Sequence, residues 1–354
     1  MRAPNAMDAL GMVPARGAEG ESAGRLRKPR LGFLGVGWIG RNRMEAIARD
    51  GCAEIAAVAD ADARTSEAAS ALAPGALRLD SLDALLDHAL DGIVIATPSA
   101  LHAQQAEAAL ARGLAVFCQK PLARTAAETR GVIEAARRAN RLLDVDLSYR
   151  RTAGMQRIRD LVSAGEIGEV YAVDLVFHNA YGPDKPWFRD PVLSGGGCVI
   201  DLGIHMIDLA LWTLGFPRVA AVSSRLHAAG RRLVLPSSSV VEDHAVAQID
   251  LAGGAVVRLA CSWNLPAGRD AVIEASFHGT RGGAAFRNVG GSFYDFVAER
   301  FEGTRTTPLA SPPDDWGGRA AVHWARALAN GGAFDPRIER LEEVAAVLDA
   351  IYER

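Results

Sequence analysis

Short, almost continuous apolar runs alternate with amphipathic stretches from residue 30 to residue 147. Runs of strand length lie at residues 30–34, 54–59, 92–96, 114–118 and 142–147, and helical patterns lie at residues 38–49, 82–88, 100–112 and 125–140. Strands that are apolar throughout must be covered on both faces of their sheet. The alternation therefore predicts an α/β domain over residues 30–147, with a doubly wound parallel sheet of the Rossmann type.

The pattern changes at about residue 148. Runs with strand character follow one another at residues 170–178, 220–226, 244–250, 256–263 and 272–277, and helical patterns lie at residues 155–164, 198–214, 319–330 and 341–353. Tandem strands that are separated by turn signals predict a mostly antiparallel sheet. Residues 148–354 are therefore expected to form a second, α+β domain that holds the substrate and the oligomer interface.

Composition narrows the possible functions. The chain has 354 residues and a formal net charge of −3, and this balance argues against nucleic acid or an anionic membrane as the main partner. Its four cysteines show no CxxC or metal-ligand spacing, which predicts no metal site and a cytoplasmic protein with free thiols. No apolar run approaches the roughly 20 residues of a membrane span. Residues 1–29 lack a sustained apolar period and are expected to be a disordered tail.

A glycine-rich turn follows the first predicted strand. The segment GVGWIG comprises Gly35, Val36, Gly37, Trp38, Ile39 and Gly40, and it fits GxGxxG. In this motif the glycines allow a tight turn, a close approach to a pyrophosphate, and helix–strand packing. Asp60 ends the next strand about 20 residues later, as the dinucleotide fingerprint requires. Strand, turn, helix and acid together predict a dinucleotide site.

The same acid bears on the choice of cofactor. A carboxylate at position 60 accepts hydrogen bonds from ribose hydroxyl groups and repels a 2′-phosphate, and Asp62 adds to that repulsion. Arg64 has the opposite tendency, because a nearby arginine can accommodate the phosphate. NAD is therefore favoured over NADP.

The helical segment DLGIHMIDLALW contains an acid–base pattern. Asp201 and His205 are four residues apart, and Asp208 lies three residues further along the same stripe. An aspartate beside an imidazole can orient it and stabilise its charged form. The alternative interpretation is a solvated helix face with an incidental histidine. A GGG turn before the helix, in a chain that has a dinucleotide site, favours a general acid or base.

A further cationic side chain stands at a strand end. The apolar run at residues 115–118 leads into Gln119, Lys120 and Pro121. In a parallel sheet, ligands bind at the carboxyl ends of the strands. Lys120 is therefore expected to lie in the ligand site.

Taken together, GVGWIG, TPSALHAQQAEAALARGLAVFCQKPLA and GGGCVIDLGIHMIDLALW resemble the glucose-fructose oxidoreductase / inositol dehydrogenase (Gfo/Idh/MocA) family. The resemblance implies a Rossmann domain, a second domain whose open sheet forms a dimer or tetramer interface, and a last helix that packs back on the first domain. It also implies catalytic roles for Lys120, Asp201 and His205. Thr97, Pro98 and His102 match the family's cofactor-side TPxxxH segment, although His102 has a core or interface position as its alternative.

Gln119 departs from the family's Glu-Lys-Pro motif. A carboxylate beside Lys120 would support its charge, whereas an amide can orient the lysine with less electrostatic support. Direct contact of Gln119 with cofactor or substrate is the alternative. We therefore expect a Gln119→Glu variant to stay active and to change its pH profile.

The substrate expected from the resemblance is a sugar, a cyclitol or a related secondary alcohol or lactol. Tyr149, His178, Asn179 and Trp187 are candidate contacts, because they follow strand ends or lie in the long loop before the acid–base helix. A dihydrodiol-type dehydrogenase and a non-catalytic NAD-binding regulator of the same fold remain as alternatives. The acid–base pattern argues against the regulator, and Gln119 is the feature in its favour.

Overall fold

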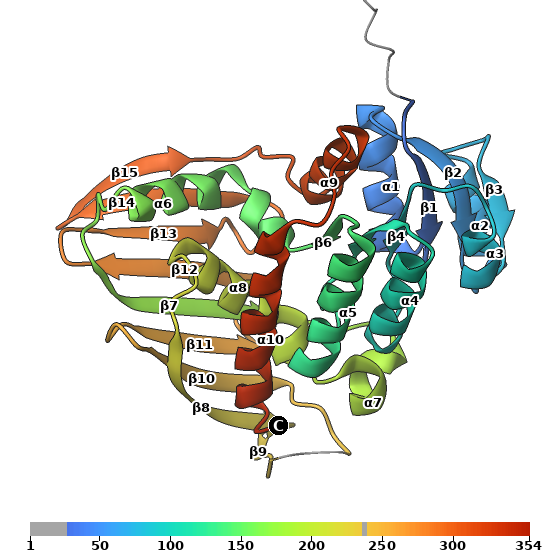
Figure 1. The fold of residues 1–354 in the computed structure, drawn as a ribbon. Coiled ribbons are helices and arrows are strands. Elements are labelled where there is room, and N and C mark those ends of the chain that lie inside the picture. The colour runs from blue at the N-terminus through green and yellow to red at the C-terminus, as the bar shows by residue number, and fades with distance from the viewer. Residues whose placement is uncertain (1–26, 236–238) are drawn as a thin grey trace, which may run out of the picture.

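The computed structural model describes residues 27–235 and 239–354. The disordered tail expected at residues 1–29 thus lies outside the described residues except for its last three. Two sheets lie side by side, each with its own helices (Figure 1).

The first sheet has six parallel strands in the order β3-β2-β1-β4-β5-β6. Its strands are β1 (Arg30–Leu34), β2 (Glu54–Ala59), β3 (Leu77–Leu79), β4 (Gly92–Ile95), β5 (Ala115–Cys118) and β6 (Leu143–Val145). Its helices are α1 (Trp38–Asp50), α2 (Ala63–Ser70), α3 (Leu82–Leu86), α4 (Ser99–Ala111) and α5 (Ala126–Ala139). Apolar clusters on both faces bury the strands, which confirms the doubly wound Rossmann sheet.

Two short elements of this domain escaped the sequence pattern, namely α2 and β3. Strand β3 is exposed at two of its three residues, so it has no apolar run to reveal it. The strand order reverses between β1 and β4, and ligands of such sheets bind where the order reverses.

The second sheet has nine strands in the order β15-β14-β13-β12-β7-β11-β10-β8-β9. Its strands are β7 (Val170–Asn179), β8 (Val219–Ala228), β9 (Arg231–Arg232), β10 (His244–Leu251), β11 (Val256–Ser262), β12 (Ala271–Gly279), β13 (Gly283–Asn288), β14 (Phe296–Glu302) and β15 (Arg305–Ala310). All neighbours pair antiparallel except β7 and β11. The mostly antiparallel sheet is thus confirmed, and the sequence pattern missed β9 and β13–β15.

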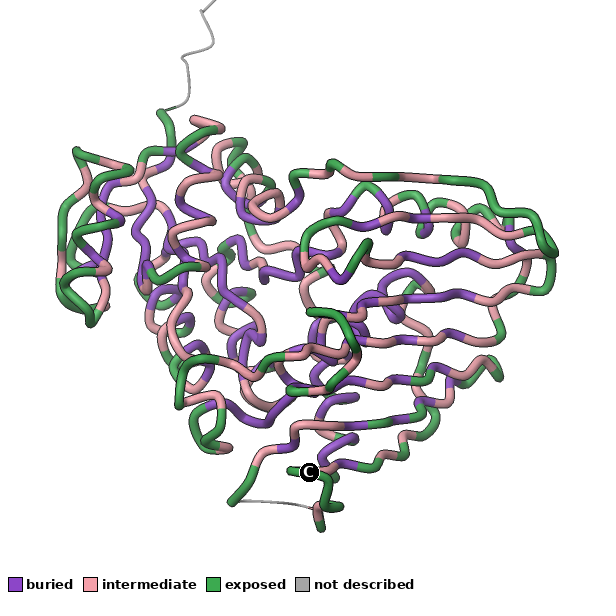
Figure 2. Tube along the Cα trace, turned by 180° about the vertical axis from the view of Figure 1, so that it is seen from behind, coloured by how far each residue is buried: buried purple, intermediate pink, exposed green. Residues whose placement is uncertain are grey.

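Helices α6 (Ala153–Ser163), α8 (Ile204–Thr213) and α10 (Arg340–Ile351) lie on one face of the second sheet (Figure 1). Buried and accessible positions alternate along its strands, as the view from behind shows (Figure 2). In β10, Ala245 and Ala247 are buried, whereas Val246 and Gln248 are exposed. The sheet therefore has one covered face and one open face.

The last two helices connect the domains. Helix α9 (Arg319–Ala329) places Trp324 in the core of the first domain, where its ring lies 5.7 Å from that of Phe117. Helix α10 packs against α5 of the first domain and against α8 and β8 of the second.

One helical segment of the described residues, Pro191–Thr213, is long and apolar enough to cross a membrane by length and composition. It joins α7 (Pro191–Ser194), the turn η3 (Val199–Gly203) and α8, and 78% of its apolar window is buried in the protein. Its apolar character is therefore that of a core helix.

Candidate active site

A cavity of about 1100 Å³ lies between the two domains. Residues of both domains line it: Val36, Gly37, Trp38, Ile39, Arg41, Asn42, Arg43, Arg64, Thr97, Pro98, Ser99, His102, Gln119, Lys120 and Asp146 from the first, and Ser148, Tyr149, Lys185, Trp187, Phe188, Asp201, His205, Tyr294 and Trp316 from the second. The sequence-predicted cofactor and catalytic segments thus meet in one space.

The glycine turn is shaped for close approach. Gly35 has φ of +81°, and a Cβ there would lie 2.5 Å from the carbonyl oxygen of Ala96. A Cβ on Gly40 would lie 2.1 Å from the carbonyl oxygen of Gly35, so this glycine allows helix and turn to touch. At Gly37 a Cβ would meet open space, and no side chain caps the N-terminus of α1. The first amides of α1 are therefore available to a phosphate group, which the residues present fit well.

Asp60 stands behind this turn, outside the lining of the cavity. Its carboxylate accepts hydrogen bonds from the backbone N–H of Val36, at 2.8 Å, and of Asp62, at 2.9 Å. Arg64 lines the cavity on the same side. The carboxylate thus fixes the shape of the glycine turn and places a negative charge near the end of β2.

Lys120 and Asp201 form the central ion pair of the cavity. The Lys120 Nζ lies 2.7 Å from the Oδ1 of Asp201 and donates also to its carbonyl oxygen, at 2.7 Å. The Oδ2 of Asp201 accepts from the Nε1 of Trp263 at 3.1 Å. An ammonium group has three N–H donors, and the described residues supply two acceptors, so Lys120 keeps one donor for a ligand. The two domains are joined through these two side chains.

The partner of Asp201 is therefore Lys120 and not His205, which differs from the expectation. The residues before α8 form a π-type turn, η3, which is wider than an α-helical turn. Asp201 lies within this turn, and both Asp201 and His205 still line the cavity. Asp208 lies outside the cavity lining, 1% exposed, and pairs with Arg150.

His205 faces the cavity beside an aromatic ring. Its ring centroid lies 5.0 Å from that of Tyr149 in an edge-on arrangement. Burial, with the positive charges of Lys120 and Arg43 as smaller causes, holds the pKa of His205 well below its usual value of 6.5. The imidazole is therefore neutral at pH 7, the form that accepts a proton.

The TPxxxH segment braces two strand ends. The ring nitrogens of the buried His102 lie 2.7 Å from the carbonyl oxygen of Pro121 and 2.8 Å from that of Thr97. Burial lowers the pKa of His102, although both carbonyl contacts oppose this effect. His102, Thr97 and Pro98 all line the cavity, so the histidine connects the segment after β4 to the one that holds Lys120.

Gln119 does not contact the side chain of Lys120 by a hydrogen bond. Its Nε2 donates to the Oδ2 of Asp146, which also accepts from the Nε of Arg43 at 2.5 Å. The expectation that the amide orients Lys120 therefore needs correction. The reason is the buried carboxylate of Asp146 on the neighbouring strand end, which accepts a hydrogen bond from the amide N–H.

Of the four candidate substrate residues, two line the cavity and two lie outside its lining. Tyr149 and Trp187 line the cavity. His178 and Asn179 lie outside its lining: the Nδ1 of His178 is 2.8 Å from the hydroxyl of Ser262, and the Oδ1 of Asn179 accepts from the N–H of Tyr181. They are at the end of β7, where the strand alternation turns His178 toward the open face.

Sequence reasoning missed several cavity residues. Arg43 lies on α1 beyond the GxGxxG motif, and Asp146 follows a strand that has no motif. Tyr294 and Trp316 come from loops far along the chain. The one available signal was Asp146 itself, a charged residue directly after a short apolar run.

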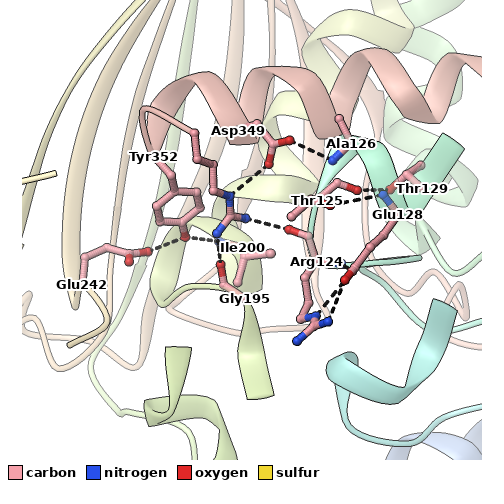
Figure 3. A network of polar contacts seen from close by, with 11 residues as sticks. Arg124, Thr125, Ala126, Glu128, Thr129, Gly195, Ile200, Glu242, Asp349 and Tyr352 are labelled. Carbon is pink, nitrogen blue, oxygen red and sulfur yellow. Dashed lines mark hydrogen bonds and ion pairs between the residues drawn. The ribbon is translucent and has the colours of Figure 1, made fainter. Parts of the chain in front are cut away.

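The last residues of the chain brace the segment that leads into α8 (Figure 3). The Tyr352 hydroxyl donates to the Oε1 of Glu242 at 2.8 Å and accepts from the N–H of Ile200 at 3.2 Å. Arg354 donates to the carbonyl oxygens of Gly195, at 2.7 Å, and Arg124, at 2.6 Å. This C-terminal brace, Tyr352 and Arg354, ties the GGG turn to the segment that follows Lys120.

Two family descriptions match the chain. "Oxidoreductase family, NAD-binding Rossmann fold" matches residues 29–147, and "GFO/IDH/MocA C-terminal domain" matches residues 155–285. D-xylose 1-dehydrogenase (NADP(+)) 2 of Haloferax volcanii is 31% identical over 330 residues, which are 91% of this chain and 96% of that protein. The chain belongs to the Gfo/Idh/MocA oxidoreductase family.

Other relatives agree with this membership. D-glucoside 3-dehydrogenase of Escherichia coli K12 is 30% identical over 203 residues, and this match spans 55% of the chain and 58% of that relative. The crystal structure of GenD2 from gentamicin A biosynthesis, in complex with NAD, has 26% identity and a TM-score of 0.75 and covers 96% of this chain and 97% of that one. The fold and the NAD-binding Rossmann domain are thus those of the family.

Proposed function

We propose that the protein is an NAD-dependent dehydrogenase that oxidises a secondary alcohol or lactol of a sugar or cyclitol, or carries out the reverse reduction. The observation behind this proposal is the meeting of Lys120, Asp201 and His205 with the glycine turn in one cavity. Relatives that are named as dehydrogenases of D-glucosides and D-xylose support a carbohydrate as the substrate.

The cofactor, when bound, supplies the acceptor for a hydride. The chain then has to take a proton from the hydroxyl group and stabilise the oxygen as negative charge develops on it. The neutral imidazole of His205 takes the proton. The remaining N–H of Lys120 donates to the developing alkoxide, while Asp201 holds the ammonium group in place.

We infer NAD rather than NADP, since Asp60 follows β2 behind the glycine turn and its negative charge disfavours a 2′-phosphate there. Tyr149 and Trp187 line the cavity and are the proposed substrate contacts. The open face of the second sheet, which exposes Tyr171 and Val246, is the proposed contact of a homodimer or homotetramer. Free cysteines suit a cytoplasmic protein.

The test is a turnover assay. Purified protein is mixed with NAD, and separately with NADP, and with a panel of aldoses, inositols and sugar acids, while reduced cofactor is followed optically. Lys120→Met and His205→Ala are expected to lower kcat by at least about 100-fold, because each removes a group that acts on the reacting oxygen. Lys28→Met, at an exposed residue outside the cavity lining, is the matched control. Wild-type rates in the first two variants would contradict the assignment.

A further inference from the structure

Asp146 has a buried carboxylate in which one oxygen accepts hydrogen bonds and the other has no donor among the described residues. It is 1% exposed and follows the end of β6. Its Oδ2 accepts from Arg43, at 2.5 Å, and from the Nε2 of Gln119. Its Oδ1 is buried and has no hydrogen-bond partner among residues 27–235 and 239–354. Asp146, Arg43 and Gln119 all line the cavity.

A buried carboxylate oxygen without a donor is unfavourable in a protein interior, since desolvation is then uncompensated. Arg43 and Gln119 hold the group by its other oxygen, and they are themselves 5% and 7% exposed. The side chain is therefore locked in orientation from one side. A buried acceptor without a donor, in a residue that lines the cavity, is suited to a ligand that supplies the missing donor.

The position of the group indicates which ligand. Asp146 and Gln119 follow the ends of the adjacent strands β6 and β5, and Arg43 belongs to α1, which begins at the glycine turn. All three belong to the dinucleotide-binding domain. Gln119 is also the immediate neighbour of Lys120, whose ammonium lies where the hydride-transfer chemistry is proposed. The nicotinamide riboside half of the cofactor has the donors required, two ribose hydroxyl groups and a carboxamide.

We propose that Asp146, oriented by Arg43 and Gln119, binds the nicotinamide riboside half of the dinucleotide by accepting a hydrogen bond at Oδ1. The family motif has a glutamate at position 119, and this chain has an amide there. In this part of the site the carboxylate therefore stands at position 146 and not at position 119, and Gln119 is the donor that orients it. The proposal rests on the proposed dinucleotide cofactor and is independent of the sugar.

The test measures binding without turnover. NADH, ADP-ribose and ADP are titrated against the wild type and Asp146→Asn, with protein fluorescence or calorimetry as the readout. Loss of a hydrogen bond to a charged group is expected to weaken NADH binding by about 10- to 100-fold. ADP, which lacks the nicotinamide riboside, is expected to bind unchanged. ADP-ribose separates the donors: weaker binding assigns the bond to a ribose hydroxyl, and unchanged binding assigns it to the carboxamide.

Asp144→Asn is the matched control, because Asp144 lies on the same strand but outside the cavity lining. The double variant Gln119→Glu/Asp146→Asn returns the carboxylate to position 119, within the same network, and is expected to recover NADH affinity relative to Asp146→Asn. If Asp146→Asn does not fold, the double variant Arg43→Met/Asp146→Asn is used in its place, because it removes both buried charges together.

NADH affinity within twofold of the wild type in the folded Asp146 variant would overturn the proposal. So would an equal loss for ADP, since the effect would then be a general disturbance of the domain. A double variant that binds no better than Asp146→Asn would overturn the transfer of the carboxylate between the two positions. If the wild type binds NADH but oxidises no sugar, the proposed function fails while this assay still decides the role of Asp146.

Discussion

Replacing Tyr352 by phenylalanine isolates the C-terminal brace, because it removes one oxygen atom and keeps the ring. Tyr352 is 6% exposed, and Glu242, its acceptor, is 2% exposed. The Oε atoms of Glu242 also accept from the N–H groups of Gly197, at 3.0 Å, and Val199, at 2.9 Å. Without the hydroxyl, the carboxylate keeps two donors, and the N–H of Ile200 loses its partner.

The magnitude follows from these two losses. A hydrogen bond to a charged group contributes about 1.5–3 kcal/mol, and a buried N–H without a partner costs about 1–3 kcal/mol. Since the turn at Ile200 can relax in part, we expect Tyr352→Phe to lower the free energy of unfolding by about 2–4 kcal/mol. A single domain has about 5–15 kcal/mol in total. The variant should therefore fold, with a clearly lower urea midpoint.

The assay is urea unfolding followed by circular dichroism, with wild type and variant compared for midpoint and for slope. Tyr171→Phe is the control, since Tyr171 is 56% exposed on the open sheet, and a change below about 0.5 kcal/mol is expected there. Tyr352→Phe should also lower kcat, because Asp201 follows Ile200 directly. A change in stability as small as that of the control would refute the reasoning that the brace holds the turn η3 in place.

Three further predictions concern the active site. The pKa of His205 is held well below 6.5, so the rate of alcohol oxidation should stay constant near neutral pH and fall only as the pH drops through that lowered pKa. Lys120→Gln removes one of the positive charges that lower the pKa of His205, so this pKa should rise toward 6.5 in an NMR titration. Lys120→Arg keeps the charge and should leave the pKa of His205 unchanged. Equal His205 pKa values in the two variants would contradict the electrostatic explanation. Asp60→Asn keeps an oxygen for the N–H of Val36 but removes the charge, so the ratio of kcat/KM for NADP to that for NAD should rise by about tenfold or more. An unchanged ratio would assign cofactor choice to other residues, with Arg64 the first to examine.

The apolar pattern alone predicted the central strands of the first domain. Its central strands are buried on both faces, so each appears in the sequence as an uninterrupted apolar run. The glycines of the turn stand at fixed spacings because the backbone makes close contacts at those positions. Lys120 was predictable for the same reason, because the end of a parallel strand is a ligand edge wherever the strand occurs. By contrast, β13 to β15 and β3 have no such runs, since an open sheet face or an exposed edge allows polar residues.

Only the tertiary structure decided which charges meet. The spacing of Asp201 and His205 suggested a pair, but the carboxylate of Asp201 pairs with Lys120, which lies 81 residues away in the chain. Arg43, Gln119 and Asp146 are likewise separated by up to 103 residues, and Arg43 and Asp146 belong to no motif. Periodicity reports the solvent exposure of each position within its own element. The partner of a buried charge is set by how elements pack, and that information is distributed over the whole chain.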